Sequence, residues 1–186
     1  MKWMIASDIH GSAYYCRKLL ERFEEEEADG LLLLGDILYH GPRNDLPEEY
    51  SPKKVIAMLN PLKDKIVCVR GNCDAEVDGM VLEFPITDER KDLYMDTIPV
   101  VAVHGHHLED LPVQELTKGT VVISGHTHIP CIREEKGVVF LNPGSVSIPK
   151  EESAHGYIIY DNATFRFMDL EGGEYMKFTQ KIQFVK

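Results

Sequence analysis

W-M-I-A-S-D-I-H-G, at residues 3–11, joins a short apolar run to an aspartate and a histidine. An apolar run of this length without alternation is typical of a β-strand that is buried on both faces. Similar runs rich in Val, Ile and Leu occupy residues 31–34, 65–69, 98–103, 121–124 and 138–141. The sequence therefore predicts buried strands, with polar side chains where the first of them ends.

Helical patterns lie between the early strands. Ser12 is the predicted N-cap of a helix over residues 13–27, and a second helix opens at Ser51 and Pro52. This alternation of strand and helix is typical of right-handed crossovers and predicts a largely parallel sheet. Beyond about residue 98, the segments come closer together and three alternate like antiparallel strands: 156–160, 164–168 and 175–179. We therefore expect the second half to supply a second sheet that packs on the first.

Composition and charge exclude several classes of protein. The 186 residues are 44% hydrophobic and 27% charged, which fits a single globular domain over 1–186. The formal charge of −11 argues against binding to a nucleic-acid polymer, which requires Lys and Arg on one face. The apolar runs are too short for a signal peptide or a membrane span, so no membrane association is expected. Four scattered cysteines without a CxxC pair favour a reducing, cytoplasmic location.

Potential metal ligands follow five of the buried strands. The carboxyl ends of strands in an open α/β sheet share one edge, and positions two apart in an extended chain point the same way. Any one of these residues alone could be a turn residue or a surface histidine. Together they predict a metal site at that edge, formed by Asp8, His10, Asp36, Asn72, His104, His126 and His128.

The predicted ligand set suits two metal ions rather than one. Its seven members are too many for one ion, and Asp36 can bridge a pair. Imidazole, carboxylate and amide donors without a cysteine cage fit Mn²⁺, the expected metal, with Fe²⁺, Co²⁺ and Zn²⁺ as alternatives. Two such ions, roughly 3.5–4 Å apart, stabilise an in-line displacement at phosphorus. The acidic chain would thus hold a locally positive phosphate site.

The motifs D-I-H, G-D, G-N, H-G-H and G-H-T-H, in this order, resemble those of the calcineurin-like metallophosphoesterases. Three longer stretches are similar to the small bacterial YfcE-type phosphodiesterases: 35–44, 69–74 and 142–150. The resemblance extends to about residue 160. It implies an α/β fold, a four-layer α/β/β/α sandwich of two mixed sheets flanked by helices. It also implies a phosphodiesterase. We expect the reaction to be hydrolysis of small or aryl diesters through a metal-bridging hydroxide.

The resemblance also distributes the ligands between the two ions. One metal would take Asp8, His10, Asp36 and His128. The other would take Asp36, Asn72, His104 and His126.

Cys73 departs from the family pattern. Most of the family reads G-N-H at this loop, and that histidine is thought to help protonate the leaving oxygen, whereas this chain reads G-N-C. A thiol is a weak donor, so Cys73 is either a catalytic residue in place of the histidine or a filler of a small apolar gap. Arg43 and Asn44 follow Asp36 on a long loop and are expected to contact a substrate phosphate oxygen.

Two alternatives to a phosphodiesterase stay open on the sequence alone. One is a non-catalytic interaction module on the same fold, like the phosphoesterase-like subunit of the retromer coat, although here all seven ligand positions are filled. The other is a phosphomonoesterase. The expected partner is a small-molecule phosphodiester, and assembly into a homo-oligomer is left open.

Overall fold

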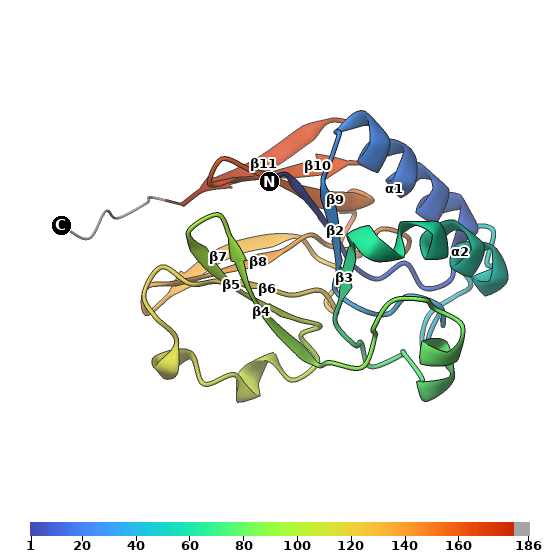
Figure 1. Cartoon of the computed structure of the whole chain (residues 1–186), viewed down its shortest axis with the longest axis horizontal. Helices are drawn as coiled ribbons and strands as arrows, with labels where there is room; N and C mark the ends of the chain where they lie inside the picture. Colours follow the sequence, from blue (N-terminus) through green and yellow to red (C-terminus); the bar gives the residue numbers. More distant parts are fainter. Residues whose placement is uncertain (181–186) are drawn as a thin grey trace.

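The computed structural model describes residues 1–180, and within them two mixed β-sheets pack face to face (Figure 1). The first sheet of this described part has six strands in the order β11-β10-β9-β1-β2-β3, and the second has five in the order β4-β5-β6-β8-β7. The sandwich of two mixed sheets expected from the sequence is confirmed.

The first sheet combines both ends of the described chain. Its parallel part consists of β1 (Trp3–Ala6), β2 (Gly30–Leu33) and β3 (Ile66–Cys68). Its antiparallel part consists of β9 (Gly156–Asp161), β10 (Thr164–Asp169) and β11 (Glu174–Thr179). The second half was expected to supply the second sheet, but these three strands join the first sheet instead. β1 pairs with β2 along one edge, and β9 satisfies the backbone groups of its other edge.

The second sheet lies between residues 90 and 142 and contains β4 (Arg90–Met95), β5 (Ile98–Val103), β6 (Val121–Ile123), β7 (Cys131–Glu135) and β8 (Val138–Asn142). The outermost strands, β4 and β7, were not among the predicted strands. Both carry exposed charged residues, as edge strands commonly do, so they lack the apolar run that marks a buried strand.

Helices cover the outer face of the first sheet. α1 (Ala13–Glu25) begins at the predicted cap, because the Ser12 side-chain oxygen accepts a hydrogen bond from the Tyr15 backbone N–H at 3.2 Å. α2 (Pro52–Leu59) begins at the predicted proline and continues into the 3₁₀ helix η1 (Asn60–Lys65). Both α-helices lie on the same side of the sheet (Figure 1) and bury Cys16, Leu19, Phe23, Val55 and Leu59 against it.

The fourth layer of the sandwich is made of short turns instead of α-helices. The segment containing η3 (Leu108–Asp110) and η4 (Val113–Glu115) packs Leu108, Leu111, Val113 and Leu116 on the outer face of the second sheet. A further 3₁₀ turn, η2 (Glu76–Met80), follows β3.

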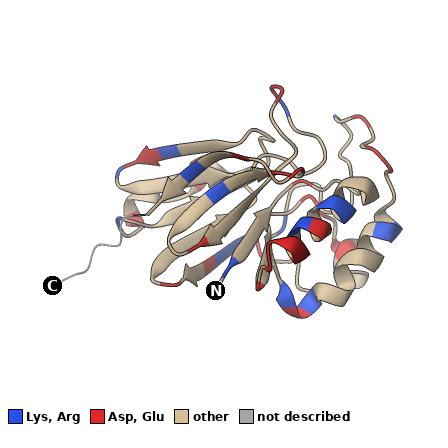
Figure 2. Ribbon diagram, turned by 90° about the horizontal axis from the view of Figure 1, so that it is seen from above, with Lys and Arg blue, Asp and Glu red and all other residues tan. Residues whose placement is uncertain are grey.

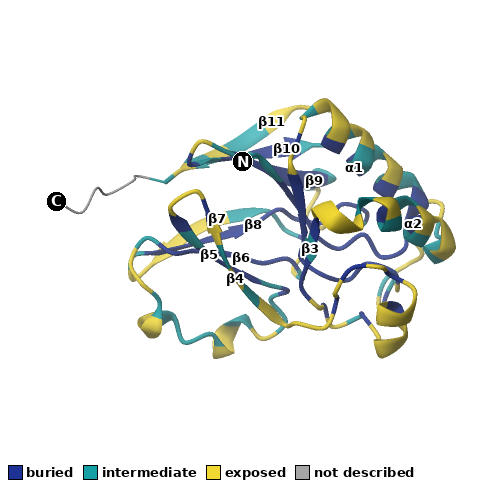
Figure 3. Ribbon diagram, viewed as in Figure 1, coloured by how far each residue is buried: buried dark blue, intermediate teal, exposed yellow. Residues whose placement is uncertain are grey.

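Burial is concentrated in the strands of the two sheets (Figure 3). The core between the sheets contains residues of both, such as Leu32 from β2 and Val121 from β6. Lys and Arg are interspersed with Asp and Glu over the helices and strands (Figure 2). Within residues 1–180, every helix is too short or too polar to span a lipid bilayer.

Candidate metal centre

The loops that follow β1, β2, β3, β5 and β6 meet at one end of the sandwich, and backbone hydrogen bonds join them. The N–H groups of Asp8 and His10 donate to the carbonyls of Gly35 and Asp36, at 3.1 and 2.9 Å. The Gly125 N–H donates to the His104 carbonyl at 2.8 Å. Five separate segments of the sequence therefore contribute to one cluster, as the strand-end pattern predicted.

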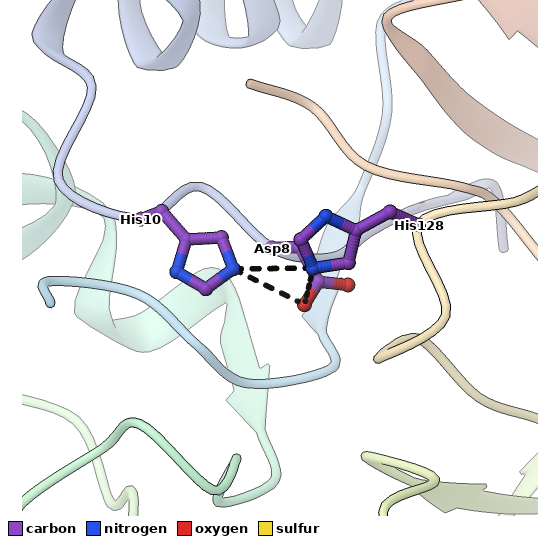
Figure 4. A group of neighbouring side chains, drawn as sticks. All are labelled: Asp8, His10 and His128. Carbon is purple, nitrogen blue, oxygen red and sulfur yellow. Dashed lines mark hydrogen bonds and ion pairs between the residues drawn. The ribbon is translucent and has the colours of Figure 1, made fainter. Parts of the chain in front are cut away.

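Asp8, His10 and His128 form the more buried half of this cluster (Figure 4). The Nε2 atom of His128 lies 3.2 Å from Asp8 Oδ1, and the Nε2 atom of His10 lies 3.6 Å from the same oxygen. The two Nε2 atoms are 3.3 Å apart. The three side chains point toward one another, Asp8 and His10 from the loop after β1 and His128 from the loop after β6, and at most 3% of each residue is exposed.

Backbone carbonyls fix the orientation of three histidine rings. The Nδ1 atoms of His10, His104 and His128 lie 2.7, 2.7 and 2.8 Å from the carbonyl oxygens of Tyr39, Leu34 and Ile148. A carbonyl can only accept, so Nδ1 carries the proton in each ring. In the neutral ring, Nε2 then presents its lone pair to the cluster, which is the tautomer that a metal ligand requires.

Asp36 connects the two halves of the cluster. Its Oδ2 atom lies 3.7 Å from His10 Nε2 and 3.4 Å from His104 Nε2. On the far side, the Asn72 side-chain oxygen lies 3.0 Å from the same His104 nitrogen. Asp36 thus contacts a histidine of each half of the cluster.

His126 lies at the edge of the cluster. Its backbone N–H donates to Asp8 Oδ2 at 3.0 Å, and its ring centroid is 5.1 Å from that of His104. The ring is half-buried and lies next to the His104 ring. His106 stands behind it, with ring centroids 5.5 Å from His104 and 6.1 Å from His126.

The donor set of the cluster fits divalent cations. Asp8 Oδ1 is buried and has no hydrogen-bond donor, and it faces two Nε2 lone pairs. His104 Nε2 likewise faces the acceptor oxygens of Asp36 and Asn72. Two sets, Asp8–His10–His128 and Asp8–Asp36–His104, each bring ligand atoms within 4.8 Å of one another. Acceptors that face acceptors need a positive charge between them, and this mixture of nitrogen and oxygen suits Mn²⁺, Fe²⁺, Co²⁺ or Zn²⁺.

The pKa values of the cluster without metal also indicate that positive charge is favoured there. Burial opposes the charged form of His104, but its contact with the Asp36 carboxylate prevails and raises the imidazole pKa to about 9. Burial likewise opposes ionisation of Asp8, but its contacts with His10 and His128 prevail and hold the carboxyl pKa below its ordinary value. Protons on the imidazoles therefore supply positive charge at this site when no metal does.

The ligand-bearing turns have an unusual backbone. Asp8, His10, Asp36, His126 and His128 all have a positive φ, between 49° and 68°. Few residues other than glycine adopt this conformation, and it is concentrated at functional sites. We had assumed that ligands two residues apart lie in an extended chain. This assumption was wrong for the pair Asp8 and His10 and for the pair His126 and His128. Tight turns, not extended strands, bring these side chains to the cluster.

Cys73 lies beside the cluster. Its sulfur and the ligand atoms of His10 and Asp36 lie within 4.8 Å of one another. Partial burial, together with the negative charge of Asp36, raises the thiol pKa to about 12. Cys73 is therefore a neutral thiol around neutral pH, placed where it can contact a bound molecule.

The two residues predicted to contact substrate are placed differently. Asn44 uses its amide N–H to donate to the His40 carbonyl at 2.8 Å, which closes the loop next to Cys73. Arg43 is exposed on the same loop. Among residues 1–180, the structure does not bring the Arg43 guanidinium into the cluster.

Ser145 and Ser147 support the first ligand turn, a role that the sequence did not reveal. Their hydroxyl groups donate to the Asp8 carbonyl at 2.8 and 3.0 Å. Asn142, at the end of β8, donates from its amide to the Gly125 carbonyl at 2.7 Å. The N-P-G-S-V-S stretch, residues 142–147, therefore contacts both the loop after β1 and the loop after β6. In the sequence, the pair of serines two residues apart is the feature that could have indicated this supporting role.

Comparison with known proteins identifies the family. The model of the calcineurin-like phosphoesterase superfamily domain matches residues 1–164. Over 165 residues, the chain is 47% identical to phosphodiesterase YfcE of Escherichia coli strain K12, which covers 87% of this chain and 88% of that protein. The solved structure of the E. coli phosphoesterase YfcE aligns with a TM-score of 0.93 at 41% identity, covering 97% of this chain and 100% of that one.

A more distant structure shares the fold alone. Vacuolar protein sorting 29 from Cryptosporidium parvum aligns with a TM-score of 0.66 over 96% of this chain and 97% of that one, at 15% identity. The family match and the identity to YfcE carry the assignment, since both extend over most of the chain. The chain belongs to the calcineurin-like phosphoesterase superfamily.

Proposed function

We propose that this chain is a metal-dependent phosphodiesterase that hydrolyses small phosphodiesters. The observation that carries the proposal is the buried Asp8 oxygen, which faces the Nε2 atoms of His10 and His128 without a hydrogen-bond donor. The 47% identity to a protein named phosphodiesterase supports the reaction type. We also propose that residues 1–186 act as one domain, because both sheets contribute to the core between them.

The proposed site holds two divalent cations, with Mn²⁺ expected. Asp8, His10, Asp36 and His128 would hold one, and Asp36, Asn72, His104 and His126 the other. Bound there, the cations would supply Lewis-acid charge that stabilises the phosphate oxygens and activates water. The donor set of each half supports this assignment, since Asp36 lies within 3.7 Å of a histidine nitrogen of both.

The protein's own groups orient the ligands and shape the site. The carbonyls of Tyr39, Leu34 and Ile148 hold the protons of three imidazoles away from the cluster, so that Nε2 stays available. The neutral Cys73 thiol stands next to Asp36, where it can contact the substrate but donates only a weak hydrogen bond. A site with these groups favours diesters whose leaving group departs as a stable anion, such as an aryloxide.

The test is turnover of a bis-aryl phosphodiester by chelated protein, before and after addition of Mn²⁺, Co²⁺, Zn²⁺ or Mg²⁺. We expect no turnover after chelation and recovery with Mn²⁺. The His128→Gln variant should lose that recovery, whereas His107→Gln, at an exposed position outside the cluster, should keep it. Absence of turnover with every metal would refute the enzymatic proposal and favour an interaction module.

A further inference from the structure

The carboxylate of Asp74 is buried and fully occupied by backbone donors. Only 4% of the residue is exposed. Its Oδ1 atom accepts a hydrogen bond from the Ile37 N–H at 2.8 Å. Its Oδ2 atom accepts from the N–H groups of Asp36 at 2.8 Å and Gly71 at 2.7 Å. Both oxygens are therefore turned toward the backbone.

These donors belong to two different ligand-bearing loops. Asp36 and Ile37 follow β2, whereas Gly71 precedes Asn72 in the loop after β3. The connection is reciprocal, because the Cys73 N–H donates to Asp36 Oδ1 at 2.8 Å. Each loop thus contributes one carboxylate that accepts a hydrogen bond from a backbone N–H of the other loop.

The two loops also interlock through a glycine. A Cβ atom at Gly71 would lie 2.1 Å from Asp36 Oδ1 and 2.5 Å from the Asp36 nitrogen. A side chain at this position would therefore displace Asp36. The close approach leaves the Asp36 carboxylate little freedom, so the hydrogen bonds between the loops control where its second oxygen points.

We propose that Asp74 is a positioning residue of the metal centre, which fixes the spacing between Asp36 and Asn72 by tying together the loops that carry them. This inference rests on the metal-dependent function proposed above. Asp74 itself does not act as a ligand, because its oxygens are engaged with three N–H groups. The three N–H donors offset the cost of burying its carboxylate, so this one group holds both loops in contact.

The alternative is that Asp74 merely stabilises a turn. The two roles differ in what an asparagine at this position would do. The amide keeps one acceptor oxygen but turns an NH₂ group toward at least one N–H, which forces the loops apart. Loss of a partner that only orients ligands typically weakens metal affinity or activity by roughly 10–100-fold. A turn-stabilising role would lower stability without this selective loss.

The matched control is Asp78. It is similarly buried, at 7% exposed, and accepts one backbone N–H, from Ala75 at 2.9 Å. Asp78 lies in η2, outside the interlocked loops. The Asp78→Asn variant therefore removes a comparable buried carboxylate while leaving the Asp36 and Asn72 loops joined.

The experiment compares Asp74→Asn and Asp78→Asn with the wild-type protein. Thermal unfolding in chelator reports stability, and calorimetric titration with Mn²⁺ reports affinity and stoichiometry. Electron paramagnetic resonance of the Mn²⁺-loaded protein reports the magnetic coupling between two ions that share a ligand. Turnover of a bis-aryl diester gives kcat and KM separately.

We expect Asp74→Asn to bind Mn²⁺ about 10–100-fold more weakly, to lose the coupled signal and to lower kcat more than it raises KM. Asp78→Asn should lower stability while keeping the affinity and the coupling. Wild-type affinity and coupling in Asp74→Asn would overturn the inference and leave the proposed function intact. A wild-type protein that binds no Mn²⁺ would instead overturn the proposed function. Should Asp74→Asn not fold, Asp74→Ser keeps one acceptor oxygen and is judged by the same criteria.

Discussion

The Nε2 atoms of His10 and His128 lie 3.3 Å apart, although the Nδ1 atom of each ring donates its proton to a backbone carbonyl. With both rings neutral, two lone pairs face each other beside the buried Asp8 Oδ1 atom. Lone pairs at this distance repel unless a proton or a metal ion lies between them. The cluster is therefore arranged for a bound cation.

Removal of metal should destabilise the fold. Since a cation binds the native cluster only, Mn²⁺ at about 100 times its dissociation constant should add roughly 2.7 kcal/mol to the free energy of unfolding. For a chain of this length, that shifts the unfolding temperature by about 5–10 °C. Calorimetry of chelated and reloaded protein measures the shift, which His107→Gln should retain and His128→Ala should reduce. Equal unfolding temperatures with and without Mn²⁺ would contradict the site.

Metal affinity should increase with pH. The pKa of His104 is raised to about 9 in the metal-free protein, because the Asp36 contact outweighs the effect of burial. A ligand imidazole must release this proton, so Mn²⁺ affinity should rise about tenfold for each pH unit between 7 and 9. Titrations at several pH values, in two buffers of different ionisation enthalpy, measure the affinity and the released proton. An affinity independent of pH in this range would rule out the coupling.

Metal-free protein should show the opposite trend in stability. A histidine whose pKa rises from 6.5 to about 9 on folding contributes stability below pH 6.5 and loses it as the pH rises through 9. The Asp8 carboxyl, whose pKa is lowered, stays ionised throughout this window. We therefore expect chelated protein to unfold at a lower urea concentration at pH 9 than at pH 6.5. The His104→Gln variant should reduce this difference, and His10, whose pKa is also raised because its contacts with Asp8 outweigh burial, should contribute to the remainder. An unchanged difference would show that groups other than His104 cause it.

Asp36 should be the most damaging ligand to lose. Its Oδ2 atom contacts histidines of both halves, at 3.7 and 3.4 Å, whereas the Asn72 side chain contacts a histidine of one half, His104. Asp36→Asn should therefore abolish turnover and reduce bound Mn²⁺ by more than Asn72→Ala does. Metal analysis and diester turnover measure both effects, with the exposed Asp64→Asn, outside the potential metal-binding groups, as the control. An Asp36→Asn protein that kept two ions and near-normal turnover would show that Asp36 is not shared.

The strands and the candidate ligands were accessible from the sequence for one physical reason. Buried strands leave apolar runs, and the residues that terminate them are conspicuous because a run ends abruptly in Asp, Asn or His. This is why Asp8 and His104 could be found without coordinates. Strands β4 and β7 escaped prediction because edge strands expose charged side chains and carry no such run.

The inner geometry of the site was beyond the sequence. Asp and His adopt positive φ more often than most residues do, but whether Asp8 or His128 does so depends on the surrounding turns, which the sequence does not show. The carbonyls that orient the imidazoles are present at every position of a chain, so their roles emerge only from the fold. The attachment of β9 to β1 was also hidden, because the apolar pattern of a strand does not state which neighbour it pairs with.

The neutral thiol of Cys73 should influence which substrates the enzyme hydrolyses. Burial and the nearby Asp36 charge raise the pKa of this thiol to about 12, so the group beside the site is neutral and a weak donor at pH 7. Without a strong acid at the leaving oxygen, the enzyme should favour aryl diesters, whose leaving groups depart as stable anions. Monoesters and alkyl esters should be poor substrates, because they depend on protonation of the leaving oxygen.

Cys73→His supplies an imidazole that can act as a general acid, a contribution that is typically on the order of 10²–10⁴ when the group is well placed. Turnover of monoesters and alkyl diesters should therefore rise relative to that of activated aryl diesters, which gain little from protonation. Cys73→Ser is the matched control, because it keeps a small hydroxyl donor and should not change this ratio. A Cys73→His protein that kept its metal content and its fold but showed an unchanged ratio would refute the argument. Cys73 would then serve packing alone, and the preference for diesters would have to arise from the shape of the site.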